Sequence, residues 1–239
     1  MNRSEFLRTT LGIIALSNTS MKPFKNYDPL ILIGKGSPKL VGLRFTVLPE
    51  VKIALEEMTQ AARNDGIEIK VVSSYRSYDR QKDIWNSKFM KFEKQGLKNI
   101  AIVDEIIKYS TIPGTSRHHW GTDIDIIDGA QTDNGDLLVT KKFHGNGPYN
   151  NLRNWMEANA EKFGFLKPYN QDPKRKGFLY EPWHYSYAEK SIAMLNAYLE
   201  LDAISLIKDR DLLGADLLDS KFIKTYLNNH ILGIDSALL

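Results

Sequence analysis

Residues 116–125 read Ser-Arg-His-His-Trp-Gly-Thr-Asp-Ile-Asp, and residues 181–184 read Glu-Pro-Trp-His. A catalytic zinc ion needs three nitrogen or oxygen ligands and an open fourth position for water. Two imidazoles and one carboxylate meet that need, and a further carboxylate nearby can accept a proton from the activated water. The residues that can fill these roles are His118, Asp125 and His184 as ligands and Glu181 as the base.

The spacing of the first stretch indicates how it is folded. His118 and Asp125 lie seven positions apart with Gly121 between them, so they are not a helical His-Glu-x-x-His pair. Residues 122–127 alternate, which places isoleucines on one face of a strand and Asp123 and Asp125 on the other. We therefore expect ligands from a loop and from the strand that follows it, with the polar face pointing into a site.

These residues carry a family resemblance. The pattern Ser-x-His-x-x-Gly-x-x-x-Asp followed by Glu-x-x-His resembles the zinc D,D-carboxypeptidases of the VanY type, which belong to a group of peptidoglycan peptidases with the D-Ala-D-Ala dipeptidases and lysostaphin-like enzymes. The resemblance extends through Ser-Ser-Tyr-Arg-Ser-Tyr at 73–78 and Pro-Gly-Thr-Ser at 113–116, and so spans roughly residues 40–190. Four linked motifs in a consistent order are far more specific than one short pattern.

The resemblance implies an α+β fold of the hedgehog/D,D-peptidase-like kind, in which a small, mostly antiparallel sheet carries the zinc site and helices flank it. It implies one zinc ion per chain, held by His118, Asp125 and His184, with Glu181 as catalytic base. Arg76 is the candidate that binds the substrate carboxylate or stabilises the transition state. Ser116 is expected to contact the same carboxylate or to fix the His118 loop, and Gln81 to orient the arginine.

Two further residues in the first stretch need an assignment. His119 could be a ligand in another register, but the family pattern selects His118, so we expect His119 in the cleft wall or in contact with substrate. Asp123 departs from the family pattern, which usually has alanine there. Because it shares a face with Asp125, we expect it to hydrogen-bond a metal-binding imidazole.

The favoured function is hydrolysis of the terminal D-Ala of peptidoglycan stem peptides by water activated on zinc, with Glu181 accepting the proton. The same site could instead cleave an L,D bond or act as an endopeptidase. An alternative of another class is a non-catalytic peptidoglycan-binding module, although no motif residue is lost. A structural zinc site would favour four closed ligands, usually with cysteine, and the chain has none.

Composition sets the remaining expectations. The 239 residues suit one domain, and the net charge of +3 is too small to argue for nucleic acid. The sequence contains no run of eighteen apolar residues, so it predicts no conventional membrane span. Residues 1–20 resemble a signal peptide with a short apolar core, which predicts export to the cell envelope or periplasm. We expect the catalytic domain at 21–190 and a C-terminal helical extension at 191–239.

Local patterns predict the secondary structure. Helices are expected at about 49–64, from 78, at 100–109 and at 149–163, and the stretch after 187 is expected to be helical. Strands are expected at 30–33, 67–72, 122–127, 165–169 and 177–187, with a hairpin around Asn134-Gly135. The last of these strands would present Glu181 and His184 on opposite sides unless it bends, and only the family resemblance implies that bend.

Overall fold

The computed structural model describes residues 27–132 and 134–239, so the predicted signal peptide at 1–20 lies outside the described residues. The α-helices are α1 Pro29–Leu32, α2 Pro49–Asn64, α3 Tyr78–Lys94, α4 Ile100–Ile106, α5 Asn150–Asn159, α6 Ala188–Leu199, α7 Ala203–Leu206 and α8 Ser220–Tyr226. The strands are β1 Ile69–Ser73, β2 Asp123–Asp128, β3 Phe165–Leu166 and β4 His184–Tyr187. The short helices are η1 Arg117–Trp120, η2 Thr140–Phe143, η3 Ala160–Phe163, η4 Ala215–Leu217, η5 Leu227–Ile231 and η6 Ser236–Leu238. Within the described ranges, no helix is long and apolar enough to cross a membrane.

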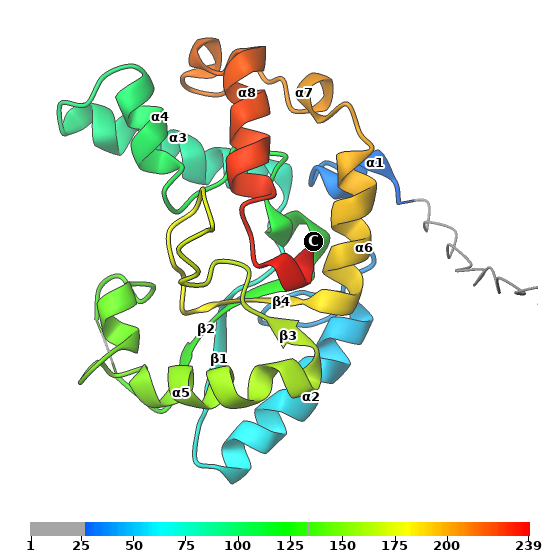
Figure 1. Cartoon of the computed structure of the whole chain (residues 1–239), viewed down its shortest axis with the longest axis vertical. Helices are drawn as coiled ribbons and strands as arrows, with labels where there is room; N and C mark the ends of the chain where they lie inside the picture. The colour runs from blue at the N-terminus through cyan, green and yellow to red at the C-terminus, as the bar shows by residue number, and fades with distance from the viewer. Residues whose placement is uncertain (1–26, 133) are drawn as a thin grey trace, which may run out of the picture.

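The four strands form one antiparallel sheet in the order β1-β2-β4-β3, with helices on both sides, which confirms the predicted α+β class (Figure 1). In the β2–β4 pair, Asp125 lies opposite His184 and Asp123 lies opposite Ser186. Residues directly opposite each other in a sheet share a face. The register therefore gathers the polar side chains of both strands on one face of the sheet.

The other face of the sheet is apolar. Ile124 of β2 lies opposite Tyr185 of β4, and both belong to a buried cluster that includes Val51 and Met58 of α2 and Leu152 of α5. Figure 1 shows α2 and α5 on this side of the sheet. Burial of this face sets the register, because a slip by one residue would turn the polar set into the core.

A second buried cluster lies on the polar side of the sheet, beyond the site. It joins Trp85 of α3 and Trp120 of η1 to Tyr198 of α6, Tyr226 of α8 and Leu238 near the C-terminus. The Trp85 indole donates to the Leu213 carbonyl at 2.9 Å. The C-terminal segment is thus packed against the helices that carry the site motifs.

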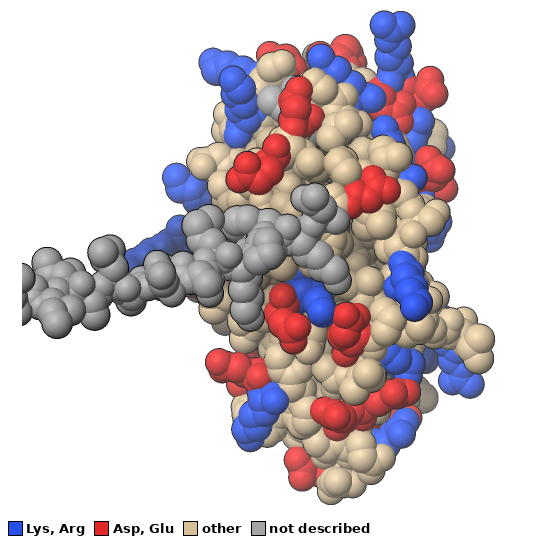
Figure 2. Space-filling view, turned by 90° about the vertical axis from the view of Figure 1, so that its right-hand side faces the viewer, with Lys and Arg blue, Asp and Glu red and all other residues tan. Residues whose placement is uncertain are grey.

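On the face drawn in Figure 2, the described basic and acidic side chains are interspersed.

A bulge at the end of β1 directs the chain into the site. The pairing with β2 shifts between Val71 and Ser73, so that Ser73 lies opposite Asp125. A bulge of this kind re-aims the side chains that follow it. Four residues later, the Ser77 hydroxyl accepts a hydrogen bond from the Arg80 amide at 3.2 Å and caps α3. Arg76 therefore lies in a short segment that is fixed at both ends.

Most predicted elements are confirmed, and three local predictions are wrong. The strand expected at 30–33 is wrong: residues 30–32 lie in helix α1 and Ile33 is its C-cap, because Pro29 stands at the first position of the helix and the Asp28 carboxylate caps it. No hairpin forms around Asn134 and Gly135, where the described residues are irregular and the next strand is β3. The strand predicted at 177–187 begins only at His184.

Candidate metal centre

His118 is oriented by the short helix η1. The Ser116 hydroxyl accepts a hydrogen bond from the His118 amide at 3.3 Å, and Gly121, with φ of 69°, ends the helix in the left-handed region. The Nδ1–H of the His118 ring donates to the Ser74 carbonyl at 2.7 Å. Because Nδ1 carries the proton, Nε2 keeps the lone pair that could bind a metal ion, and it lies 3.3 Å from Asp125 Oδ2.

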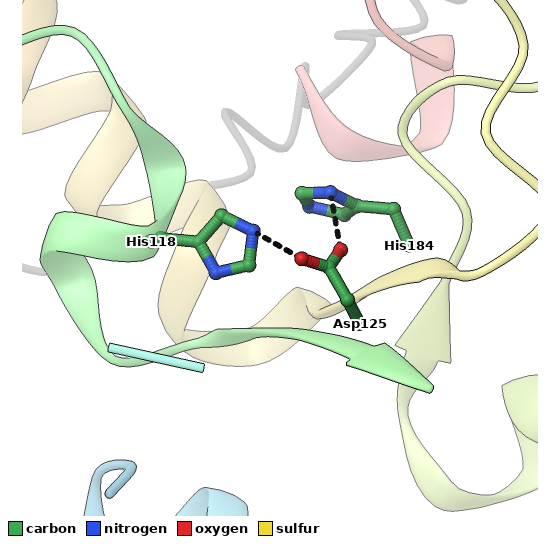
Figure 3. A group of neighbouring side chains, drawn as sticks. All are labelled: His118, Asp125 and His184. Carbon is green, nitrogen blue, oxygen red and sulfur yellow. Dashed lines mark ion pairs between the residues drawn. The ribbon is translucent and has the colours of Figure 1, made fainter. Parts of the chain in front are cut away.

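Asp125 lies between two histidine rings, as Figure 3 shows, with one oxygen directed at each. Its Oδ1 is 3.2 Å from His184 Nδ1, and the centroids of the His118 and His184 rings are 4.8 Å apart. The two histidines come from η1 and from the first residue of β4, and the carboxylate comes from β2. Cross-strand pairing therefore brings together residues that are far apart in the sequence.

The three side chains fit a metal ion. They offer one ligand atom each, these atoms all lie within 4.8 Å of one another, and all three residues are buried. Within the described ranges, His118 Nε2 and Asp125 Oδ1 are buried without a hydrogen-bond partner, which is costly unless another group satisfies them. Two imidazole nitrogens and a carboxylate oxygen match the ligand set of a catalytic zinc site.

The electrostatics also favour a cation. Burial lowers the pKa of His184, but the hydrogen bond to Asp123 and the neighbouring carboxylates of Asp125 and Glu181 outweigh burial and raise that pKa well above its ordinary value. Burial raises the pKa of Asp125, but the two histidines outweigh it and hold the pKa well below its ordinary value. An imidazole surrounded by three carboxylates lies in a strongly negative environment, and a bound cation offsets that charge.

Asp123 supports His184 from behind. Its Oδ1 accepts the Nε2–H of His184 at 2.9 Å, so that Nδ1 is left to face Asp125. The same carboxylate accepts hydrogen bonds from Arg117 at 3.0 Å, from Ser186 at 2.9 Å and from Thr122 at 2.6 Å. The predicted hydrogen bond from Asp123 to a candidate ligand is thus present, and a buried guanidinium offsets the added negative charge.

Glu181 reaches the site through a turn. The His184 amide donates to the Glu181 carbonyl at 3.3 Å, so residues 181–184 bend instead of running straight. This bend places Glu181 Oε2 3.2 Å from His184 Nδ1. Burial raises the pKa of the Glu181 carboxyl above its ordinary value, a direction that suits a general base. In a straight strand Glu181 and His184 would lie on opposite sides, and the turn brings them to the same side.

Arg76 and Gln81 form one hydrogen-bonded unit at the edge of the site. The Arg76 guanidinium donates to Asp125 Oδ2 and to Gln81 Oε1, both at 3.1 Å, and to the Ser73 hydroxyl at 3.3 Å. The Gln81 amide in turn donates to the Thr111 carbonyl at 2.9 Å. The structure therefore brings Arg76 to the candidate metal centre, with Gln81 fixing the orientation of its guanidinium.

Ser116 and His119 have mainly structural contacts. Ser116 caps η1 and also lines a cavity of about 30 Å³ beside Arg76, Glu181 and His184. His119 is fully buried; its Nδ1–H donates to the Arg76 carbonyl at 2.6 Å and its Nε2 accepts from the Gly114 amide at 3.1 Å. Burial lowers the pKa of His119 to about 3, so the ring is neutral. The prediction that His119 lies in the cleft wall is wrong.

A cleft of about 1020 Å³ opens onto the site. Arg76, Asp125 and Glu181 lie on its lining, together with residues of β1, of α3 and of the irregular segment after β2. A cleft of this size can hold a short peptide. These three side chains are thus reached from solvent through the cleft, whereas His118 and His184 are not part of its lining.

Two residues with clear roles in the geometry had no assignment from the sequence. Arg117 lies within the first stretch, and Ser186 lies two residues after His184. Both contact Asp123, and Arg117 also donates to the Ser186 hydroxyl at 2.6 Å. The signal for Arg117 was the second aspartate itself, because a buried carboxylate requires a cation or several donors.

Comparison with protein families gives a consistent result. The VanY family model, described as D-alanyl-D-alanine carboxypeptidase, matches residues 44–190, more than half of the chain. The D-alanyl-D-alanine carboxypeptidase of Enterococcus faecalis (strain ATCC 700802 / V583) is 31% identical over 134 residues, which are 56% of this chain and 45% of that protein. The putative carboxypeptidase YodJ of Bacillus subtilis (strain 168) is 31% identical over 199 residues, 79% of this chain and 64% of that protein. This chain thus spans less than two thirds of both relatives.

Solved structures share the fold. The vancomycin-resistance D,D-pentapeptidase VanY in complex with Zn(II) is similar with a TM-score of 0.53 and 24% identity, over 71% of this chain and 89% of that one. The LdcB LD-carboxypeptidase is similar with a TM-score of 0.52 and 27% identity, over 71% of this chain and 78% of that one. Because the family model matches more than half of the chain, the chain belongs to the VanY D-alanyl-D-alanine carboxypeptidase family.

Proposed function

We propose that this protein is a zinc-dependent peptidoglycan carboxypeptidase that removes the terminal D-Ala of stem peptides ending in D-Ala-D-Ala. The observation that carries the proposal is the position of Glu181. Its Oε2 lies 3.2 Å from His184 Nδ1, beside the candidate ligands, and the residue also lines the large cleft. A carboxylate in that position can act on a water molecule and on a peptide bond at the same time.

His118, Asp125 and His184 would hold one zinc ion per chain, through Nε2, a carboxylate oxygen and Nδ1. When bound, zinc supplies a Lewis acid that makes water nucleophilic at neutral pH and polarises the peptide carbonyl. The ligand set without sulfur supports zinc in this role, and so does the Zn(II) complex of the similar VanY structure.

The chain's own residues supply the proton transfers and the charge. Glu181 accepts the proton of the attacking water on its carboxylate and then donates it to the amine of the departing D-Ala. Arg76, fixed by Gln81 and Ser73, places positive charge where the oxyanion develops or where the substrate carboxylate binds. Ser116 lines the small cavity beside these groups and offers a hydroxyl to the same carboxylate.

A second specificity has support of its own. The LdcB LD-carboxypeptidase is 27% identical to this chain with a TM-score of 0.52, so cleavage of an L,D bond in a shortened stem peptide is the alternative. An endopeptidase action on a cross-link would use the same chemistry. Either reaction places the protein in the cell envelope, where its substrate lies, and we propose that location.

The test is mass spectrometry of two peptides after incubation with the protein. One is a stem pentapeptide ending in D-Ala-D-Ala, and the other is a stem tetrapeptide whose last bond is L,D. We expect the pentapeptide to lose one alanine, and a chelator or the Glu181→Gln variant to prevent the loss. Loss of alanine from the tetrapeptide alone would favour the L,D reading, and cleavage of neither would contradict the proposal.

A further inference from the structure

Lys88 is a partly buried basic side chain in the cleft that has no partner in the part of the chain that the structure describes. Lys88 of α3 lines the cleft, and it forms no hydrogen bond or ion pair with any other residue in the described ranges. Lys167 provides a comparison, since it is also largely buried but its ammonium is 2.9 Å from the Glu157 carboxylate. The two lysines differ in that Lys167 has an ion-pair partner and Lys88 has none. An unpaired charge that is partly buried costs free energy.

Lys88 lines the same cleft as Arg76, Asp125 and Glu181. Its burial lowers its pKa, and the charges of Glu181 and Asp136 act against that shift, while those of Arg76 and Lys91 add to it. All four of these groups line the same cleft. Neither carboxylate forms an ion pair with the ammonium, and Lys88 is part of the lining of the space that a bound peptide would fill.

The helix α3 presents more than one cation to this space. Arg80, Ile84, Lys88 and Lys91 follow at spacings of four, four and three residues, which places them on one face of the helix. All four line the cleft, and Arg44 lines it from the segment before α2. Arg76 differs from these residues, because its guanidinium is already bonded to Asp125, Gln81 and Ser73.

We propose that Lys88 is a binding site for a carboxylate of the bound peptide, which makes the cleft selective for acidic peptides. The inference rests on the proposed peptidase function and names a part of its substrate. A peptide can offer this carboxylate in two places, at its C-terminus or on an acidic side chain. The ammonium would then gain in the complex the anionic partner that it lacks in the free protein.

The test measures peptide affinity by calorimetry in the zinc-loaded full-length protein carrying Glu181→Gln, so that peptide is not consumed. Three peptides ending in D-Ala-D-Ala are compared: one with a glutamate and a free C-terminus, one with glutamine in its place, and one with the glutamate but a C-terminal amide. We expect the first peptide to bind about tenfold more tightly than one of the others, and Lys88→Gln to abolish that preference. The peptide that loses affinity identifies which carboxylate is bound.

Two variants control for charge and for folding. Lys94→Gln removes the same charge from an exposed position of α3 outside the cleft and should leave the preference intact. Lys88→Arg should retain it, and Lys88→Gln should not lower the melting temperature, because the ammonium has no partner to lose. An equal or unmeasurable affinity for the three peptides, or a preference that survives Lys88→Gln, would overturn the proposal.

Hydrolysis by the protein with Glu181 intact is measured separately. Cleavage without a charge preference would leave the proposed function in place and remove the lysine site. A charge preference without cleavage would leave the lysine site and remove the proposed function.

Discussion

Asp123 places a carboxylate in a fully buried position directly behind the His184 imidazole. Such a carboxylate fixes which ring nitrogen carries the proton and increases the basicity of the other nitrogen. Arg117 makes the arrangement tolerable, since its Nε donates to Asp123 at 3.0 Å and its guanidinium lies over the Trp120 ring. At the residue scale, the candidate metal centre depends on the ion pair of Asp123 and Arg117, neither of which is a candidate ligand.

We predict that Asp123→Asn weakens zinc binding about 10- to 100-fold. Asparagine preserves the shape and can still accept the His184 N–H, but it removes the negative charge and leaves Arg117 unpaired. Competition with a chromophoric chelator measures the affinity. Asp128→Asn is the matched control, because Asp128 ends the same strand and, among the described residues, its carboxylate accepts a hydrogen bond only from the Ala130 amide, at 3.0 Å. Equal affinities in the two variants would contradict this role.

The candidate ligands could be predicted from the sequence because zinc chemistry restricts the residue types, and the family pattern restricts the spacing. The contact between Asp123 and Arg117 could not be predicted from the sequence. Arg117 is six residues before Asp123, and their contact depends on the tight turn of η1 and on the left-handed Gly121. No periodic pattern encodes that geometry, and His119 was misplaced for the same reason.

At the scale of elements, His119 connects segments that meet behind the site. The ring joins the Arg76 carbonyl to the Gly114 amide, and it packs directly against Gly34, the second residue after α1. A Cβ atom at Gly34 would lie 2.4 Å from His119 Nδ1. The absence of a side chain at Gly34 is thus part of what holds the Arg76 segment in place.

We predict that Gly34→Ala lowers both stability and activity, because the methyl group displaces the His119 ring. Gly66→Ala is a close control: φ is +79° at Gly66 and +77° at Gly34, but a Cβ at Gly66 meets nothing within 4 Å. Backbone strain should cost both variants about 1 kcal/mol, and the clash should cost Gly34→Ala about 1–3 kcal/mol more. Urea unfolding measures the difference, and similar free energies of unfolding would argue against the contact.

The longer elements followed from local patterns, and the short ones did not. The 16-residue helix α2 shows a clear apolar stripe and was predicted to its last residue. The four-residue helix α1 consists of apolar residues that also suit a strand, and its cap decided the outcome. The start of β4 at His184 depends on the preceding turn, which forms through a tertiary arrangement around Glu181.

At the scale of the molecule, the C-terminal segment packs against the loop that leads into the site. His230 stacks on Tyr226 with ring centroids 4.7 Å apart and meets the edge of Phe178 at 4.9 Å. Tyr226 accepts the Ile112 amide through its hydroxyl and contacts the Thr115 hydroxyl, next to Ser116. The last helices therefore support the loop that carries His118, a relation that no sequence pattern indicated.

We predict that the stability of the protein falls between about pH 6.5 and pH 4, in part because of His230. Burial lowers the pKa of His230 from 6.5 to about 4 in the folded protein. In this range the unfolded chain binds a proton that the folded chain excludes, so the free energy of unfolding decreases as the pH falls. His230→Phe keeps the stacking and removes the proton. Urea unfolding at pH 7 and pH 5 should show a smaller difference for the variant, and an unchanged difference would exclude this contribution.

The central claim is that a metal held by His118, Asp125 and His184 works together with Glu181 to release D-Ala. The most direct measurement is the rate of D-Ala release from a D-Ala-D-Ala peptide, with metal content determined on the same samples, for the wild-type protein, Glu181→Gln and Asp125→Ala. We predict one zinc ion per chain in the wild type and in Glu181→Gln, with a rate about 100- to 10,000-fold lower in that variant. Asp125→Ala should lose both the metal and the activity. Full activity in the Glu181→Gln variant, or activity without metal, would contradict the account.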